Sequence, residues 1–306
     1  MVQRFFKVAL TAGVIGAAVF FAPINFSTVE AAGNTSQAVI NAEWYWLSSD
    51  SKYSKFFDPN SVKVVKKAMT DSGKEIPTEI EAWTKTTYSY EGAAETIRNY
   101  EISSILSDPK MLSYSLALLR INPQNRTIQY AREDFYNSDN KVIWSKADGR
   151  IKEINSQSFD EDFYASIVDE VFKHGEMERK NAKDRWIELW TYSDEDGSTT
   201  NVTADTTTMQ LKGTNLIVWE WQETKNSVGQ VVEIRFMKKA VNLPQGTERL
   251  VRGEVWTPSA AWQDIDDEFS GTYRMIRNDE PNYKGLIRLR AFAKGYSTWV
   301  SRYSIS

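Results

Sequence analysis

The chain has 306 residues, a formal net charge of −4 and no cysteine. This mildly acidic chain has no long basic patch, which argues against a nucleic-acid or anionic-lipid partner. The absence of cysteine excludes disulfides and cysteine metal sites, so the fold must rely on a core that 41% hydrophobic and 13% aromatic residues can build.

Residues 1–31 have the layout of a secretory signal peptide. Arg4 and Lys7 form a basic start, residues 8–22 are apolar or small, and Val29-Glu30-Ala31 offers small residues before cleavage after Ala31. The apolar run is short for a bilayer, which needs about 20 residues, although an uncleaved anchor is the alternative. We expect an exported bacterial envelope protein, found at the cell surface, in the periplasm or outside the cell. Residues 32–41 are a lead-in.

After the lead-in, the sequence predicts a first unit over residues 42–182. Aromatic and alternating runs favour strands, and Asp58-Pro59-Asn60 is typical of a turn. Residues 91–107 fit either a short helix or a packed connection. Residues 158–182 have helical spacing, with Ser158 and Glu161 as a predicted capping box. The predicted strands are 44–47, 62–65, 80–88, 112–121, 126–136 and 141–145.

A second, diverged β-rich unit is predicted over residues 183–306, with the boundary near residue 182. Its last hairpin is predicted from an alternation that puts Ile287, Leu289, Ala291 and Ala293 on the inward side. The predicted strands are 186–190, 207–211, 216–223, 230–238, 250–256, 286–293 and 297–303. The fold class is therefore α+β, with two tandem and mainly antiparallel β-sheet units, the first carrying a C-terminal helix.

A Trp-led pattern supports the tandem arrangement because it occurs twice. Residues 43–47 read Glu-Trp-Tyr-Trp-Leu and are followed by a strand with Trp83. Residues 185–190 read Arg-Trp-Ile-Glu-Leu-Trp and are followed by the Trp-rich run 216–221. A repeated module without a reactive site favours binding over catalysis.

Candidate catalytic and metal-binding residues are few. His174 is the only histidine and is predicted to be a solvated residue at a helix end, which leaves a Ser-His-Asp site only one candidate. Oxygen-rich clusters at Asp194-Glu195-Asp196 and at Asp264, Asp266, Asp267 and Glu268 are interpreted as solvated turns, with calcium as the alternative. Paired carboxylates for glycoside hydrolysis stay open because their spacing is a property of the fold.

Aromatic side chains are the more informative candidates. Most of the 11 Trp, 14 Tyr and 14 Phe are expected in the core or in cross-strand pairs. Trp83 and Trp262 are the predicted binding residues, since each lies among charged or polar neighbours and Trp is enriched in binding hot spots.

The first unit resembles the surface-adhesin protein E-like domain of bacterial envelope proteins. The matching residues are Trp44, the Phe57-Asp58-Pro59-Asn60-Ser61-Val62 turn, the Trp83-Thr84-Lys85-Thr86 strand, and the runs 118–130, 136–142 and 154–156. The second unit keeps only the Trp-led opening and the Val-Trp strand. The resemblance implies an antiparallel sheet with a C-terminal helix and, in some members, adhesion to host extracellular proteins.

These observations predict a non-catalytic binding or adhesion module for extracellular protein or cell-wall polysaccharide. No cofactor, no metal and no membrane span after signal cleavage are expected. The alternatives are an exported glycan hydrolase that uses Asp and Glu pairs, which requires two carboxylates in one cleft, and a structural envelope component.

Overall fold

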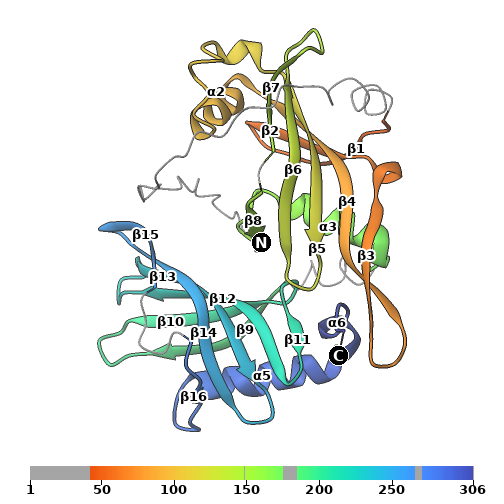
Figure 1. The fold of residues 1–306 in the computed structure, drawn as a ribbon. Helices are drawn as coiled ribbons and strands as arrows, with labels where there is room; N and C mark the ends of the chain where they lie inside the picture. The colour runs from red at the N-terminus through yellow and green to blue at the C-terminus, as the bar shows by residue number, and fades with distance from the viewer. Residues whose placement is uncertain (1–41, 148, 175–184, 266–270, 306) are drawn as a thin grey trace, which may run out of the picture. The chain divides into compact units, whose positions relative to one another are not determined.

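The computed structural model describes residues 42–147, 149–174, 185–265 and 271–305. The predicted signal peptide (1–31), the lead-in (32–41) and the predicted boundary near residue 182 lie outside these residues. Residues 42–306 form one compact unit. It contains two antiparallel sheets of eight strands each (Figure 1), which confirms the prediction of two tandem sheet units.

The first sheet has the strand order β1-β2-β4-β5-β6-β7, with β3 paired to β4 and β8 paired to β6. A 3-10 turn, η1 (Pro59–Ser61), stands where the Asp58-Pro59-Asn60 turn is predicted. The strands are β1 (Tyr45–Ser49), β2 (Tyr53–Phe57), β3 (Lys63–Met69), β4 (Glu75–Tyr88), β5 (Tyr114–Asn122), β6 (Thr127–Tyr136), β7 (Val142–Lys146) and β8 (Ile151–Glu153).

The second sheet has the order β9-β10-β12-β13-β14-β15, with β11 paired to β12 and β16 paired to β14. Its strands are β9 (Trp186–Ser193), β10 (Thr199–Asp205), β11 (Gln210–Lys212), β12 (Asn215–Lys225), β13 (Val231–Asn242), β14 (Thr247–Thr257), β15 (Ala260–Asp264) and β16 (Arg274–Met275). Adding eight to each strand number of the first sheet gives the pairing of the second. The two sheets are therefore copies of one topology.

A turn that locks onto a tryptophan shows the repeat at the level of single hydrogen bonds. In the first copy the Asp58 carboxylate accepts from the amide of Asn60 at 3.0 Å, and the Ser61 hydroxyl donates to the Asp58 carbonyl at 2.7 Å. The Ser61 hydroxyl also accepts from the amide of Trp83 at 2.9 Å. The turn between β2 and β3 is thereby tied to β4.

The second copy repeats these bonds with other residues. The Asp205 carboxylate accepts from the amide of Thr207 at 3.0 Å, and the Thr208 hydroxyl donates to the Asp205 carbonyl at 2.8 Å. The same hydroxyl accepts from the amide of Trp219 at 3.2 Å. Trp83 and Trp219 therefore hold equivalent positions, so the doubled Trp pattern marks a structural repeat.

A second turn, which follows the central strand of each copy, is also repeated. The side chain of Asn122 accepts from the amide of Asn125, and that of Asn242 accepts from the amide of Gln245. Arg126 has a φ of 50° and Gly246 has a φ of 68°. Left-handed backbone is unfavourable for most side chains, and Arg126 is held in it by bonds between its guanidinium and backbone carbonyls, including that of Ile154.

The helices lie on one face of each sheet, which we call the helix face. In the first copy α2 (Tyr90–Asn99) and α3 (Glu161–Phe172) pack on it, so residues 91–107 include a helix. α3 begins after Asp160 without a side-chain cap bond. The predicted capping box is wrong because Ser158 bonds to Asn155 and Glu161 bonds to Arg185.

The predicted hairpin over residues 286–293 and 297–303 is also wrong. The chain forms α5 (Asn282–Gly295) and α6 (Ser297–Val300) there. Leu286, Leu289 and Phe292 are buried at helical spacing while Ile287 is 51% exposed, because the apolar pattern has a period near 3.6 as well as the alternation used for the prediction. Within the described residues, no helix is both long and apolar enough to cross a membrane.

The two copies differ most between their central strands. In the first copy β4 and β5 are joined by a segment that contains α2 and the short turn η2 (Pro109–Met111), and this segment buries Ala93, Ile97 and Leu106 on the helix face. In the second copy β12 and β13 are joined by a tight turn in which Gly229 donates to the Asn226 carbonyl. The helix face of the second sheet therefore has no counterpart of α2.

Gly92 is required by the close approach of α2 to the loop before β2. A Cβ at Gly92 would collide with the carbonyl oxygen of Lys52, and this oxygen is fixed because it accepts from the Ser89 amide at 2.9 Å. We expect Gly92→Ala to lower the free energy of unfolding by about 1 to 3 kcal/mol. Gly295→Ala, where a Cβ meets nothing, should raise it by up to about 1 kcal/mol. Urea unfolding compares them, and equal effects would contradict the close approach.

Glu133 gives the fold a pH dependence. It is 6% exposed on the helix face, where Tyr100 and Ser115 donate to it, and burial raises its pKa from 4.5 to about 7. Between these values the folded state binds more protons than the unfolded state, so the free energy of unfolding falls as the pH rises, by about 3 kcal/mol in total.

We expect Glu133→Gln to remove most of this loss, because the amide keeps a hydrogen-bonding group without the charge. Urea unfolding between pH 5 and pH 8 measures it. Glu195→Gln, at an exposed turn, is the matched control and should retain the slope of the unmodified chain. The same slope in both variants would show that Glu133 is not its source.

Candidate functional site

A row of four aromatic rings follows the face of the second sheet that is opposite the helix face. We call Trp219, Phe236, Trp221 and Trp262 the aromatic row. Trp219 and Trp221 are alternate residues of β12, so both point to one face, and Phe236 on β13 pairs with Trp221. The centroid of the Phe236 ring lies 4.5 Å from that of Trp219 and 5.9 Å from that of Trp221. The centroids of the Trp221 and Trp262 rings are 6.0 Å apart.

The aromatic row has a buried end and an end that is accessible to solvent. Trp219 and Phe236 are each 4% exposed, while Trp221 and Trp262 are half-buried. The guanidinium of Arg252 lies 5.1 Å from the Trp219 ring, which is a favourable cation–π distance. A ligand can therefore contact Trp221 and Trp262. Phe236 packs against Trp221, and Trp221 packs against Trp262.

The structure does not bring the two predicted binding residues together. Trp262 is in β15 of the second sheet, whereas Trp83 is in β4 of the first, half-buried and paired with Leu118. Sequence reasoning missed Trp219, Trp221 and Phe236 as a group. The signal that could have found them is that Trp219 and Trp221 alternate along one predicted strand, and that a short turn joins this strand to the next one, which carries Phe236.

A pocket of about 430 Å³ lies on the helix face of the second sheet, beside the N-terminus of α5. Its wall includes Trp190 from β9, Gln222 from β12 and Arg235 from β13. Asn282, the first residue of α5, closes one side. By strand pairing, Gln222 and Arg235 match Thr86 and Ser115 of the first copy, where α2 and Tyr100 cover this part of the sheet. The pocket exists because the second copy has no such helix.

A buried ion-pair network forms the floor of the pocket. The Lys239 ammonium lies 2.9 Å from a Glu220 carboxylate oxygen and 3.3 Å from one of Glu248. Burial alone would lower the pKa of Lys239, but the two carboxylates raise it. Burial also raises the pKa of Glu220, although Lys239 opposes that shift. Lys239 is therefore a fixed positive charge that holds two carboxylates.

Arg274, another residue of the pocket wall, extends this network. Its guanidinium bonds to Glu248 at 2.5 Å and to Glu280 at 2.9 Å. The side-chain amide of Asn282 donates to Glu248 at 2.8 Å. These bonds fix the orientation of each side chain, which makes the pocket wall rigid before any ligand arrives.

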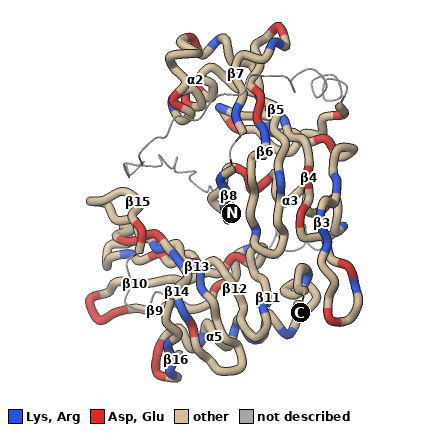
Figure 2. Tube along the Cα trace, viewed as in Figure 1, with Lys and Arg blue, Asp and Glu red and all other residues tan. Residues whose placement is uncertain are grey.

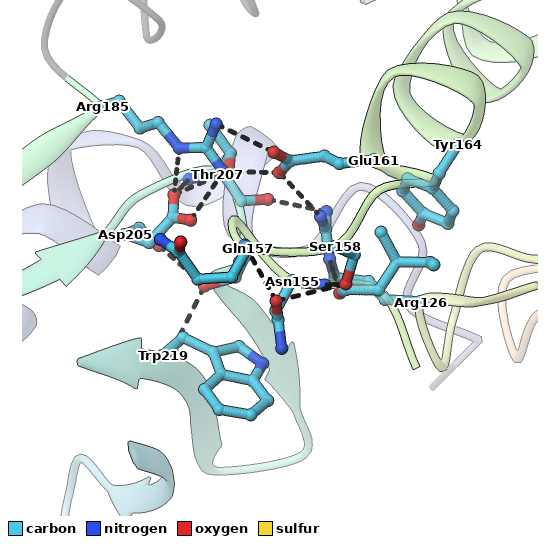
Figure 3. Close-up of polar contacts among 12 residues, drawn as sticks. Arg126, Asn155, Gln157, Ser158, Glu161, Tyr164, Arg185, Asp205, Thr207 and Trp219 are labelled. Carbon is cyan, nitrogen blue, oxygen red and sulfur yellow. Dashed lines mark hydrogen bonds and ion pairs between the residues drawn. The ribbon is translucent and has the colours of Figure 1, made fainter. Parts of the chain in front are cut away.

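A second ion-pair network joins the two copies (Figure 3). Arg185 bonds to Glu161 of α3 at 2.5 Å and to Asp205 of the second copy at 2.9 Å. Asp205 is fully buried. Burial alone would lower the pKa of Arg185, but the two carboxylates raise it. This arrangement leaves no carboxylate open to a substrate, so its role is structural.

The turn that begins at Asp205, which we call the locked turn of the second copy, also contributes to this contact between the copies through its backbone. The Thr207 carbonyl accepts from Arg126 at 3.1 Å and from Arg302 at 2.8 Å. The side-chain amide of Gln210 donates to the Pro123 carbonyl at 3.0 Å. Arg126 and Pro123 belong to the first copy, so the two sheets are attached through fixed backbone as well as through charge.

His174 is not the solvated residue that the sequence predicts. Its ring stacks on Phe172 with centroids 5.7 Å apart and meets Trp299 and Tyr303 at 6.2 Å each. Burial lowers its pKa, and its Nε2 has no hydrogen-bond partner among the described residues. The prediction fails because α6 and the segment after it bring aromatic rings over the end of α3.

The acidic clusters have different outcomes. Residues 194–197 form the exposed turn between β9 and β10, where Gly197 donates to the Asp194 carbonyl. Asp264 is exposed in β15, while Asp266, Asp267 and Glu268 lie outside the described residues. The described residues contain no group of three or more His, Cys, Asp or Glu side chains placed to hold a metal ion.

Comparisons with known proteins give no relative for this chain. No protein-family model matches it, and neither a curated protein nor a solved structure does. The proposals below therefore rest on the residues and geometry of this chain.

Arg185 provides a test of the junction. Arg185→Ala leaves Glu161 and Asp205 buried without their main cation, so we expect the free energy of unfolding to fall by about 3 to 5 kcal/mol. Arg288→Ala breaks an exposed pair with Glu188 and should cost at most about 1 kcal/mol. Urea unfolding at pH 7 measures both, and a loss at Arg185 no greater than that at Arg288 would contradict the structural role.

Proposed function

We propose that this chain is an exported protein of the bacterial cell envelope that binds polysaccharide without catalysis. The observation that carries the proposal is the aromatic row, in which two half-buried tryptophans continue a stack of two buried rings. Indole faces suit the apolar C–H faces of sugar rings, and a pre-ordered row loses little entropy on binding.

The first 31 residues support export, because they have the layout of a signal peptide. The resemblance of the first unit to surface-adhesin protein E-like domains supports a location at the cell surface. Acidic and basic residues are interspersed along both sheets (Figure 2) rather than gathered in a basic stripe, which favours a weakly charged polymer over a polyanion.

Retention on insoluble polysaccharide tests this function. The chain from residue 32 onwards is incubated with peptidoglycan sacculi and with chitin, and with immobilised fibronectin and collagen as protein ligands. We expect retention on at least one polysaccharide, and we expect Trp262→Ala to weaken it about tenfold or more, since aromatic anchors contribute about 2 kcal/mol.

Trp46→Ala is the matched control, because Trp46 is 57% exposed on β1 of the first sheet and outside the aromatic row. It should leave retention unchanged. Retention only on the protein ligands would point to adhesion instead, and no retention on any of them would point to a structural envelope component. Either result would sink the polysaccharide proposal.

A second candidate is the exported glycan hydrolase, favoured by one observation. Glu220 and Glu248 both lie within 3.3 Å of the Lys239 ammonium, so they are no farther apart than the carboxylate pairs of glycosidases, at about 5 to 10 Å. Glu220 is only 3% exposed, however, and Lys239 compensates its charge. Release of reducing sugar from the same polysaccharides, lost in Glu248→Gln, would be needed to favour catalysis.

A further inference from the structure

The pocket on the helix face of the second sheet has the chemistry of a small-ligand site. Its volume of about 430 Å³ falls within the range of about 300 to 1,000 Å³ that is usual for such sites. It lies on the opposite side of β12 from the aromatic row, because Gln222 of its wall alternates with Trp221. It is therefore independent of the surface on which the proposed function rests.

Most charged groups of the wall are already compensated within the protein. Arg235 bonds to Glu233 at 2.8 Å, and Arg274 bonds to Glu248 and Glu280. Lys239 is paired with Glu220 and Glu248. The guanidinium of Arg249 lies 5.3 Å from the Tyr273 ring centroid, and its Nε has no hydrogen-bond partner among the described residues. A free anion or cation would have to compete with these pairs. The wall therefore favours a neutral ligand that can both donate and accept hydrogen bonds.

One acceptor in the wall is unused. The amide nitrogen of Asn282 donates to Glu248, which fixes the orientation of the side chain. Its Oδ1 is buried and has no hydrogen-bond partner among the described residues. A buried acceptor without a donor is unfavourable, and a ligand hydroxyl that reached this oxygen would supply the missing donor.

Part of the lining is apolar. Trp190 of β9 packs so closely on α5 that a Cβ at Gly285 would stand 3.0 Å from its ring, and Met237 of β13 and Leu250 of β14 are further apolar lining residues. A flat apolar ring in one pocket with paired carboxylates, guanidinium groups and amides matches a molecule with hydroxyls at its edge and C–H groups on its faces. We propose that this pocket binds one neutral sugar ring.

Isothermal titration calorimetry with the chain from residue 32 onwards tests the site. The probes are glucose, galactose and N-acetylglucosamine, with glucuronate as a charged sugar and acetate as an anion without a ring. We expect at least one neutral sugar to bind, and acetate neither to bind nor to compete. Binding of acetate, or of none of the neutral sugars, would overturn the proposal.

Two substitutions place the binding in the pocket. Asn282→Ala and Gln222→Ala each remove one hydrogen-bonding group from the wall and should raise the dissociation constant of the sugar about tenfold. Arg98→Ala, at an exposed position of α2, should leave it unchanged, and thermal unfolding confirms that each variant is folded. An unchanged constant in both pocket variants would overturn the assignment.

The aromatic row separates this proposal from the proposed function. Trp262→Ala should weaken retention on the insoluble polymer about tenfold or more while the dissociation constant of the soluble sugar stays the same, since the two sites lie on opposite faces of one sheet. A loss of soluble-sugar binding in Trp262→Ala would mean that the pocket is not the binding site.

Discussion

The locked turn of the second copy, residues 205–209, is the interaction on which the rest of the structure depends. Asp205 caps its own turn and accepts from Arg185, whose guanidinium also holds Glu161 of the first copy. Arg126 and Arg302 donate to the Thr207 carbonyl of the same turn. One short segment therefore closes the second sheet, attaches the first and anchors the C-terminal end of the chain.

The C-terminal segment shows how strongly the copies are joined. Trp299 is buried in the core of the second copy, and Tyr303, four residues later, is buried in the core of the first. Tyr303 also meets Phe172 of α3, with ring centroids 4.9 Å apart. The two sheets share a boundary of packed side chains, so neither core is complete without the other copy.

The two copies share one sheet topology but differ in what covers the helix face. In the first copy α2 covers the helix face of the sheet and buries Glu133 beneath it. In the second copy a tight turn replaces that segment, and a pocket with ordered ion pairs lies in its place. The difference between the covered first copy and the second copy with its pocket therefore comes from the length of the connection between β4 and β5 or between β12 and β13, and not from sheet topology.

The strands show what local pattern can predict. The central strands were predicted because alternating and aromatic residues report a half-buried pleated surface directly. β10 was missed because its Thr- and Asn-rich run, residues 199–203, lacks that apolar alternation, and α5 was predicted as a hairpin because its apolar residues fit two periods at once. Trp262 and Trp83 are predicted as single residues, and only the strand pairings from β12 through β13 and β14 to β15 place Trp262 at the end of a row.

The sequence by itself determined that there are two tandem sheet-rich units, and it marked them with the doubled tryptophan pattern, because strand formation depends on neighbours along the chain. Tertiary structure decided the rest. His174 packs among aromatic rings, Glu220 and Glu248 meet at Lys239, and Asn282 closes the pocket. Each of these arrangements joins residues that are distant in sequence, and their proximity depends on strand register and helix placement that no local pattern encodes.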